Sequence, residues 1–545
     1  ADNNTVTVQG EGSKVRIRVL GAQASHNDYS QTVGIARANG NSVDIRDGAW
    51  VIGAVLGAEA IGDRELEEGY AEANGNTVKI SNATIGEADG SGALYPVTGA
   101  SVNAMRVQNS YGNTVEISGS VLTGGHAKED SKSYVLALSI IAGADPVSTR
   151  DNIVRFSDSE IDGYVSGTYL KNHGGSAEAS GTKVTVQGSK VGGDVKGDYV
   201  SSAAGDAIAE RGSVSVLNNS TVGGIVTGAS TTVGGTISAA SRASGNTLTI
   251  ENSKVGSYVY GGLAMNGTGG IAEASGNTLN LKNVNAPSLI MPSFAQNNGS
   301  GKAVAEGNTV TLQGGTYSGN IFGSRAYAAG SAAAAGGNTV TLQGDDVYGD
   351  GSPSFSAQVT VIWGSYALGG NKVYAPSSPN TLNFIDAKGM TAANIRNFSI
   401  LKYTLPNMIS QESVLTLTGG ADSGQTDISN ASVSVAVSEV WGRDGGEFGF
   451  GGDKSPENDR IILLKNDNGL VSDGWKQEGT IIAREGVSLA FELAAATDDT
   501  SLYLYRPETF IDPSDPDHPH PNDTMVNPQT KALAEGWLAG LTLGI

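Results

Sequence analysis

The chain of 545 residues contains no cysteine. This excludes disulfide bonds, thiol catalysis and zinc or iron–sulfur sites built on cysteine. The chain also lacks any run of about 18 apolar residues, so we expect no membrane-spanning helix. No secretory signal peptide precedes Ala1, and we expect that such a peptide is either absent or has been removed.

Aromatic and charged side chains are scarce, at 6% and 16% of the residues. The 55 acidic residues outnumber the 34 basic ones and give a net charge of −21. A field of that sign disfavours nucleic acid and anionic lipid as partners. Glycine, in contrast, is abundant, with 77 residues. This composition favours small-residue strands stacked regularly around a thin core.

The octapeptide GNTVTLQG occurs at residues 307–314 and again at 337–344. Related segments start twelve times along the chain, at intervals of 30–39 residues. We anchor each copy on the residue that aligns with the asparagine. Clear copies start at Asn76, Asn113, Asn246, Asn277, Asn308 and Asn338, and degraded copies start at Asn4, Asn41, Asn152, Thr182, Ser213 and Asn371. A repeat of this length predicts a solenoid.

Each repeat holds three strand-like pieces and shows no helical period. In the first piece Val310 and Leu312 alternate with polar residues, which predicts a half-buried strand. The second piece sets a branched residue between two small ones, as in Gly193-x-Val195-x-Gly197, and the third carries two alanines just before the next anchor. Three short strands per coil of about 30–37 residues predict an all-β fold, a right-handed parallel β-helix.

Asparagine at the anchor suits a corner of such a coil. Asparagine tolerates a left-handed backbone, and its amide can hydrogen-bond to the copies in neighbouring coils. An array of antiparallel hairpins is the competing interpretation. We favour the β-helix because identical residues recur at the length of one coil and not in mirrored pairs.

The repeats divide the chain into four predicted regions. Residues 1–384 form the repetitive rod, with polar insertions at 124–135 and 349–358 expected to be loops. Residues 385–510 remain strand-like and are predicted to cap the open end of the rod. Residues 511–526 are rich in proline and aspartate and form an extended linker. Residues 527–545 begin with Asn527-Pro528, a good helix start.

This arrangement resembles the adhesin-type passenger domain of a Gram-negative autotransporter, a type V secretion protein. The segments 244–262 and 307–323 are similar to the glycine-rich repeats of such passengers, and 527–536 is similar to the helical linker that leads into the translocator barrel. The region 385–510 resembles the autochaperone-like cap of that family. The resemblance implies export through the outer membrane to the bacterial cell surface, with possible later release. It also implies that the chain ends before a C-terminal barrel, which would be its only membrane anchor.

Few residues suggest chemistry. The five histidines, His26, His126, His173, His518 and His520, are scattered or lie in the linker, and serine-hydrolase motifs are missing. The acidic segments 343–352 and 450–460 could bind a cation, but we interpret them as turns with exposed charge. We therefore predict a protein that is not an enzyme and that carries no metal site, no catalytic residues and no cofactor.

The second strand-like piece offers a candidate contact surface. Residues that flank its buried branched position should point outward, and in four consecutive coils several of them are apolar. Stacked at about 4.8 Å, they would form an exposed apolar stripe. The stripe consists of Ile225, Tyr258, Tyr260, Leu289, Met291 and Phe322. The alternatives are that a loop covers this stripe or that these side chains are core.

These observations favour a cell-surface adhesin that binds a host-cell or matrix protein, a glycan or another copy of itself. Many weak contacts along a repetitive rod would give such a protein its avidity and support aggregation, biofilm formation and virulence. Two alternatives stay open: a β-helical enzyme acting on polysaccharide and a passive stalk that displays loops. Paired carboxylates in a cleft would favour the enzyme.

Overall fold

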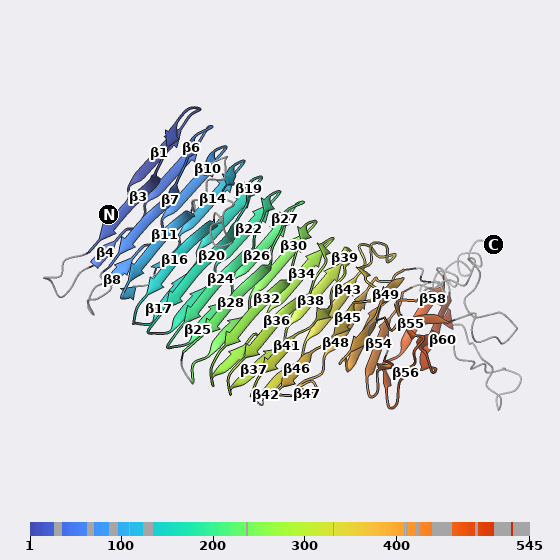
Figure 1. The fold of residues 1–545 in the computed structure, drawn as a ribbon. Helices are drawn as coiled ribbons and strands as arrows, with labels where there is room; N and C mark the ends of the chain where they lie inside the picture. The colour runs from blue at the N-terminus through green and yellow to red at the C-terminus, as the bar shows by residue number, and fades with distance from the viewer. Residues whose placement is uncertain are drawn as a thin grey trace, which may run out of the picture. The chain divides into compact units, whose positions relative to one another are not determined.

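The computed structural model describes residues 1–26, 35–62, 70–86, 96–107, 110–123, 134–235, 238–330, 332–407, 409, 413–420, 424–438, 460–485, 489–505 and 525–526. All the regular elements in these ranges are β-strands. They stack in parallel sheets as a β-solenoid of about 12 turns (Figure 1), which confirms the predicted all-β parallel β-helix. The helix predicted for 527–545, residues 511–524 of the linker, most of the insertion 124–135 and all but Arg460 of the acidic segment 450–460 lie outside the described residues.

The chain divides into two compact units, which we describe separately. The first contains Ala1–Val310, Ile321–Asn338 and Ser365–Ser378, and the second contains Thr311–Asn320, Thr339–Gly364 and Pro379–Ile545.

The first unit has four strands per coil, which follow one another in the chain and pair with their counterparts in the next coil. Sheet A contains β1 (Thr5–Gln9), β5 (Ser42–Arg46), β9 (Thr77–Ser81), β14 (Thr114–Ser118), β18 (Ile153–Ser157), β22 (Lys183–Gln187), β26 (Ser213–Leu217), β30 (Thr247–Glu251), β34 (Thr278–Lys282) and β38 (Thr309–Gln313). Sheet B contains β2 (Lys14–Val15), β6 (Trp50–Val51), β10 (Thr84–Gly86), β15 (Val121–Thr123), β19 (Glu160–Ile161), β23 (Lys190–Val191), β27 (Thr221–Val222), β31 (Lys254–Val255) and β35 (Asn285–Ala286).

Two further sets of strands complete each coil. Sheet C contains β3 (Arg18–Ser25), β7 (Ala54–Ile61), β11 (Pro96–Ala104), β16 (Tyr134–Ala142), β20 (Tyr164–Asn172), β24 (Val195–Ser202), β28 (Val226–Val233), β32 (Val259–Asn266), β36 (Ile290–Asn297), β40 (Ile321–Phe322), β41 (Arg325–Ala328), β46 (Tyr366–Gly369) and β47 (Lys372–Tyr374). The last side starts as sheet D, with β4 (Ile35–Arg37), β8 (Tyr70–Glu72) and β12 (Arg106–Val107). It continues as sheet E, with β13 (Ser110–Tyr111), β17 (Val147–Arg150), β21 (Ala177–Ser180), β25 (Ala207–Glu210), β29 (Ser241–Ser244), β33 (Ile271–Glu273), β37 (Lys302–Glu306) and β42 (Ala332–Gly336).

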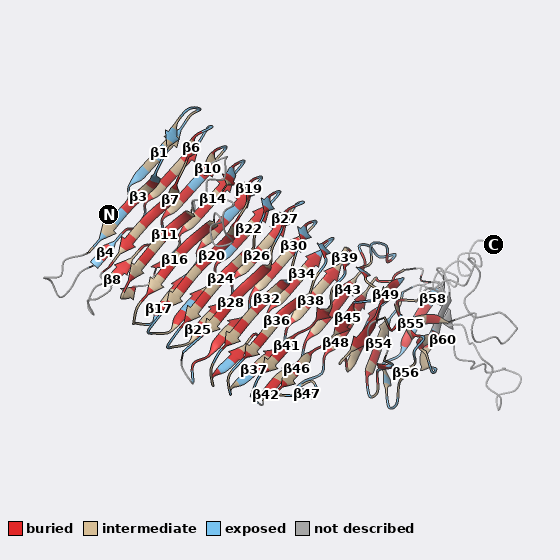
Figure 2. Ribbon diagram, viewed as in Figure 1, coloured by how far each residue is buried: buried red, intermediate tan, exposed pale blue. Residues whose placement is uncertain are grey.

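The three predicted pieces correspond to sheet A, sheet C and the D and E side. Sheet B is additional, because strands of two or three residues are too short to produce a period in the sequence. The core follows the predicted columns: valine and leucine from sheet A, branched residues from sheet C and alanine pairs such as Ala207 and Ala209 from sheet E. Figure 2 shows this alternation as repeating buried bands along the strands.

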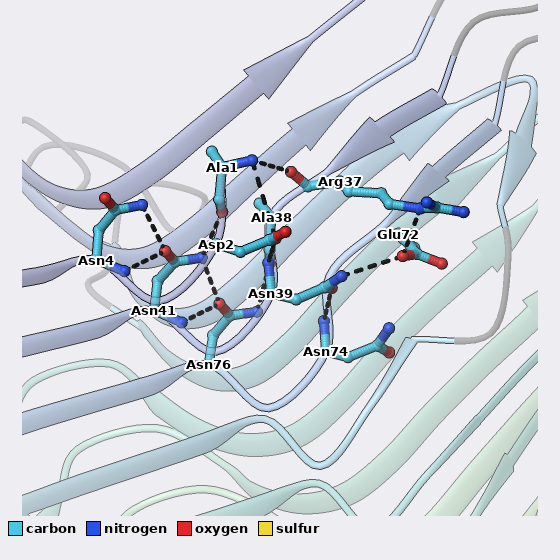
Figure 3. Close-up of polar contacts among 10 residues, drawn as sticks. All are labelled: Ala1, Asp2, Asn4, Arg37, Ala38, Asn39, Asn41, Glu72, Asn74 and Asn76. Carbon is cyan, nitrogen blue, oxygen red and sulfur yellow. Dashed lines mark hydrogen bonds and ion pairs between the residues drawn. The ribbon is translucent and has the colours of Figure 1, made fainter.

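A ladder of buried asparagine side chains runs along the anchor positions. The Oδ1 atom of Asn41 accepts hydrogen bonds from the backbone N–H and the amide of Asn4, at 3.0 and 2.9 Å. Asn76 accepts the equivalent pair from Asn41, at 2.9 and 3.0 Å, and donates from Nδ2 to the carbonyl of Ala38 at 2.9 Å (Figure 3). Each amide therefore satisfies backbone groups of two coils that would otherwise be buried without partners.

The predicted left-handed backbone lies one residue before the anchor asparagine. Gly40, Gly75 and Gly245, for example, have φ angles of 65°, 61° and 63°. Asp151 and Arg211 take this conformation in two of the degraded copies. Glycine is preferred here because it has no Cβ to clash in this conformation.

Two anchors differ from the prediction. Ser213 pairs with Thr247, so Gly212 and not Ser213 occupies the anchor position. Asn371 lies in the turn of the antiparallel pair β46–β47, and Asn380 instead precedes the strand Thr381–Ile385 that continues the repeat. The insertion within this repeat delays its strand, which sequence spacing alone did not reveal.

The second unit continues the parallel pairing and then changes to antiparallel. Its strands are β39 (Thr316–Tyr317), β43 (Thr339–Gln343), β44 (Ser354–Phe355), β45 (Val361–Trp363), β48 (Thr381–Ile385), β49 (Met390–Ala392), β50 (Asn394–Arg396), β51 (Ile400–Thr404), β52 (Leu415–Leu417), β53 (Thr426–Asp427), β54 (Ser432–Ala436), β55 (Ile461–Asn466), β56 (Leu470–Val471), β57 (Lys476–Glu478), β58 (Ile481–Glu485), β59 (Leu489–Thr497), β60 (Ser501–Tyr505) and β61 (Met525–Val526). β59 pairs antiparallel with β58, β60 and β61. The capping role of 385–510 stays a prediction.

Candidate binding trough on the outer face of sheet C

The strands of sheet C bend at a small residue in the middle. A Cβ on Gly197, Gly228 or Gly261 would lie 2.0–2.4 Å from a backbone carbonyl oxygen of the next coil, so the close approach requires glycine. The residue after the bend is also buried, as Asp198 is in β24. The alternation of inward and outward residues therefore slips by one at the bend.

Because of this slip, outward side chains before the bend meet outward side chains after it. Tyr260 precedes the bend in β32, and Phe294 follows it in β36. Their ring centroids are 6.4 Å apart with an interplanar angle of 21°. Phe322 contacts Tyr366 in the same way, edge to face at 6.4 Å. Side chains on the two sides of the bend thus contact each other across neighbouring strands on the outer face of sheet C.

We call this group of outer side chains the sheet C trough. Its floor is the column Tyr260, Met291 and Phe322, and one wall is the column Ile225, Tyr258 and Leu289. The opposite wall consists of Leu263, Phe294, Arg325 and Tyr366, which pair in register on successive strands. The strands β32, β36 and β41 that carry most of it lie side by side in Figure 1.

The six predicted stripe residues all lie in the trough, but they are not equally exposed. Tyr258 is 43% exposed, and Ile225, Tyr260 and Leu289 are half-buried. The predicted exposure is wrong for Met291 and Phe322, which are 0% and 6% exposed. These two side chains are buried, and Phe322 packs edge to face against Tyr366.

Sequence reasoning missed the second wall. Strict alternation would have pointed residue 262 outward, whereas the bend makes Leu263 the outward residue. One signal was present: Leu263, Phe294 and Arg325 are spaced by one repeat, as are the tyrosines Tyr169 and Tyr199 in earlier coils. Those two tyrosines stack at 5.2 Å, and Tyr134 stacks on Tyr164 at 5.4 Å, so the outer face of sheet C carries aromatic pairs before the trough begins.

The electrostatics of the trough combine low polarity with one cation. Burial and, to a smaller extent, the neighbouring Tyr258 raise the pKa of Tyr260, Arg325 opposes them, and the net pKa is about 12. The guanidinium carbon of Arg325 lies 5.5 Å from the ring centroid of Phe294 and 5.6 Å from that of Tyr366. Such distances are those of cation–π contacts. The Tyr260 hydroxyl therefore stays protonated at neutral pH and can donate a hydrogen bond.

The acidic segment 343–352 behaves as the predicted turn. The carboxylate of Asp346 accepts hydrogen bonds from the backbone N–H of Tyr348 at 2.9 Å and of Asp350 at 3.2 Å. Asp350 forms an ion pair with Lys388 at 3.8 Å. No group of three or more histidine, aspartate or glutamate side chains that could hold a metal ion occurs among the residues the structure describes.

Comparisons of this chain with protein-family models, with curated proteins and with solved structures find no match. In the described part of the chain, no helix is long and apolar enough to cross a membrane. We therefore infer a function from the sheet C trough.

Proposed function

We propose that this chain is the exported passenger of a bacterial cell-surface adhesin. It would adhere to a host-cell or matrix protein, to a glycan or to another copy of itself through the sheet C trough. The observation that carries this proposal is the trough itself, which collects partly exposed aromatic and apolar side chains on one face of a regular β-solenoid. Aromatic side chains of this kind dominate the binding energy of many interfaces.

A comparison with the outer face of sheet A supports the choice of this face. The outer face of sheet A is mainly threonine, serine and charged residues, which form surface ion pairs such as Arg155–Glu116 at 2.7 Å. Isolated pairs of this kind contribute little to association. The outer positions of sheet C differ, since apolar and aromatic residues recur there on consecutive strands.

Adhesion by the trough can be tested with purified protein attached to beads. We expect beads carrying the wild type to cluster or to attach to cells or matrix, and beads carrying Tyr258→Ser/Leu263→Ser/Phe294→Ser to lose most of this attachment. The matched control is Ile153→Ser/Leu217→Ser, which removes half-buried apolar side chains from the outer face of sheet A. Sedimentation velocity over a concentration series separates self-association from attachment to a foreign surface.

Thermal unfolding of all three proteins checks that the trough variant is folded. Equal attachment of the trough variant and the wild type would contradict the proposal. We avoid Phe322→Ser in this experiment, because Phe322 is buried and its removal would destabilise the fold.

A further inference from the structure

Arg325 supplies the positive charge in the sheet C trough. Arg325 stands between Phe294 and Tyr366 on the three successive strands β36, β41 and β46. Both rings lie within 5.6 Å of its guanidinium carbon. Both rings can make cation–π contacts with the guanidinium group, which donates hydrogen bonds in its own plane.

Among the residues that the structure describes, none accepts a hydrogen bond from the side chain of Arg325. The Nε atom of Arg325 is buried without a hydrogen-bond partner. Within the described ranges, Arg325 also forms no ion pair, whereas Arg18, Arg37 and Arg155 all pair with glutamates. Nε itself is too deeply buried to reach a ligand, so an oxygen anion from outside the chain would bind the terminal Nη groups.

The surroundings restrict what can carry this anion. The whole chain has a net charge of −21, which repels polyanions at long range. Arg325 can satisfy one anionic group, while the neighbouring side chains Tyr258, Leu263 and Phe294 offer apolar and aromatic surface to uncharged atoms. The sheet edges within sheet C are already paired on both sides of β36, so a peptide cannot add to it as a strand.

We propose that the trough binds a saccharide chain that ends in one carboxylated sugar. The carboxylate is held on the terminal Nη groups of Arg325, and the C–H faces of the following neutral sugars pack on the aromatic wall. Tyrosine hydroxyls such as that of Tyr260 supply further hydrogen bonds to sugar oxygens. This inference rests on the proposed adhesive function and names its ligand class.

The test is isothermal titration of the full chain with sialyllactose, with lactose as the matched neutral probe and with hyaluronan as the polyanion. We expect sialyllactose to bind at least about tenfold more tightly than lactose, and Arg325→Gln to remove this difference. Arg325→Lys keeps the charge but loses the planar N–H edge, so it should restore only part of the preference. Arg155→Gln removes one exposed positive charge elsewhere and should leave binding unchanged.

A second variant tests the aromatic wall. Phe294→Leu should weaken both sialyllactose and lactose, and leucine fits this position because Leu263 occupies it one coil earlier. Binding of hyaluronan that Arg325→Gln and Arg155→Gln weaken equally would overturn the proposal in favour of a general charge effect.

The outcomes also separate this inference from the proposed function. If no saccharide binds but bead attachment to a protein-coated surface still depends on the trough, the glycan is wrong and adhesion stands. If neither saccharide binding nor attachment depends on the trough, both fail. Thermal unfolding of Arg325→Gln and Phe294→Leu shows whether a loss of binding reflects a loss of folding.

Discussion

Asp198 is a buried acid in the interior of the first unit. It lies in β24, is 0% exposed and sits where the asparagine ladder is interrupted, between Thr182 and Gly212. Burial raises its pKa to about 6, although the nearby hydroxyls of Thr182 and Thr168 lower it. The two carboxylate oxygens have no hydrogen-bond partner, and the two hydroxyls lie 3.1 Å from each other.

This carboxyl should make stability depend on pH. Its pKa is about 6 in the native state against 3.8 as the ordinary value, so the native state binds more protons between these limits. The free energy of unfolding therefore falls as pH rises from about 4 to about 6, by roughly 3 kcal/mol, and stays low above that. Asp198→Asn should flatten this dependence and raise the urea midpoint at pH of about 7.5. Glu160→Gln, which removes a surface carboxylate, should leave the slope intact.

The trough side chains divide into surface and structural residues. Phe322→Ser should lower the free energy of unfolding by about 3–5 kcal/mol, because it leaves a cavity beneath the wall of the trough. Tyr258→Ser should change it by less than about 1 kcal/mol, because Tyr258 is 43% exposed. Urea denaturation measures both. Similar losses for the two variants would mean that the trough is packed differently.

At the scale of the element, the asparagine ladder joins one coil to the next. The Oδ1 atom of Asn277 accepts hydrogen bonds from the backbone N–H and the amide of Asn246, at 2.9 and 3.1 Å. Its own amide donates to the carbonyl of Ala243 at 2.9 Å and to Ser293 at 2.8 Å. One side chain therefore satisfies polar groups from several strands.

Removal of one member of the ladder should be costly. Asn277→Ala would leave the backbone N–H of Asn246 and the carbonyl of Ala243 buried without partners, which should lower the free energy of unfolding by about 2–4 kcal/mol. Thr249→Ala, a change on the outer face of sheet A, should cost under about 1 kcal/mol. Urea denaturation of the two variants provides the comparison. A smaller loss for Asn277→Ala than for Thr249→Ala would show that the ladder does not stabilise the coils.

The elements differ in how clearly the sequence pattern predicts them. Val310 and Leu312 alternate with threonine over five residues, so sheet A was predictable. The alanine pairs of sheet E were predictable for the same reason. Lys190–Val191 is too short to show any period, so sheet B was missed. The bend at Gly261 shifts the alternation of inward and outward residues without changing the repeat length. Strict alternation therefore predicts that Tyr258 belongs to the site, and it misses Phe294 and Arg325.

At the scale of the whole molecule, the first unit is a stack in which each coil contacts mainly its neighbours. Stability in such a stack is a sum of local contributions, so it need not be uniform. The coils that start at Thr182 and Gly212 lack the anchor asparagine and contain Asp198. These coils combine a missing ladder rung with a buried carboxylate.

We expect this part of the stack to open first. In hydrogen exchange at pH of about 7.5, the amides of β22 and β26 should exchange faster than those of β30 and β34, where the ladder is continuous. Asp198→Asn should slow exchange in β22 and β26 and leave β30 and β34 unchanged. Uniform protection across the four strands would contradict this expectation.

The asparagine ladder also bears on how the gene can change. Each anchor asparagine offers the same acceptor to the coil before it and the same donor to its neighbours, so any two intact coils can meet at a new joint. An in-frame duplication or deletion from one anchor to the next, such as Asn308 to Asn338, would therefore leave every buried amide with a partner. The identical GNTVTLQG segments at 307–314 and 337–344 are suitable points for such recombination. The length of this protein can thus vary by whole coils while its hydrogen bonding stays the same.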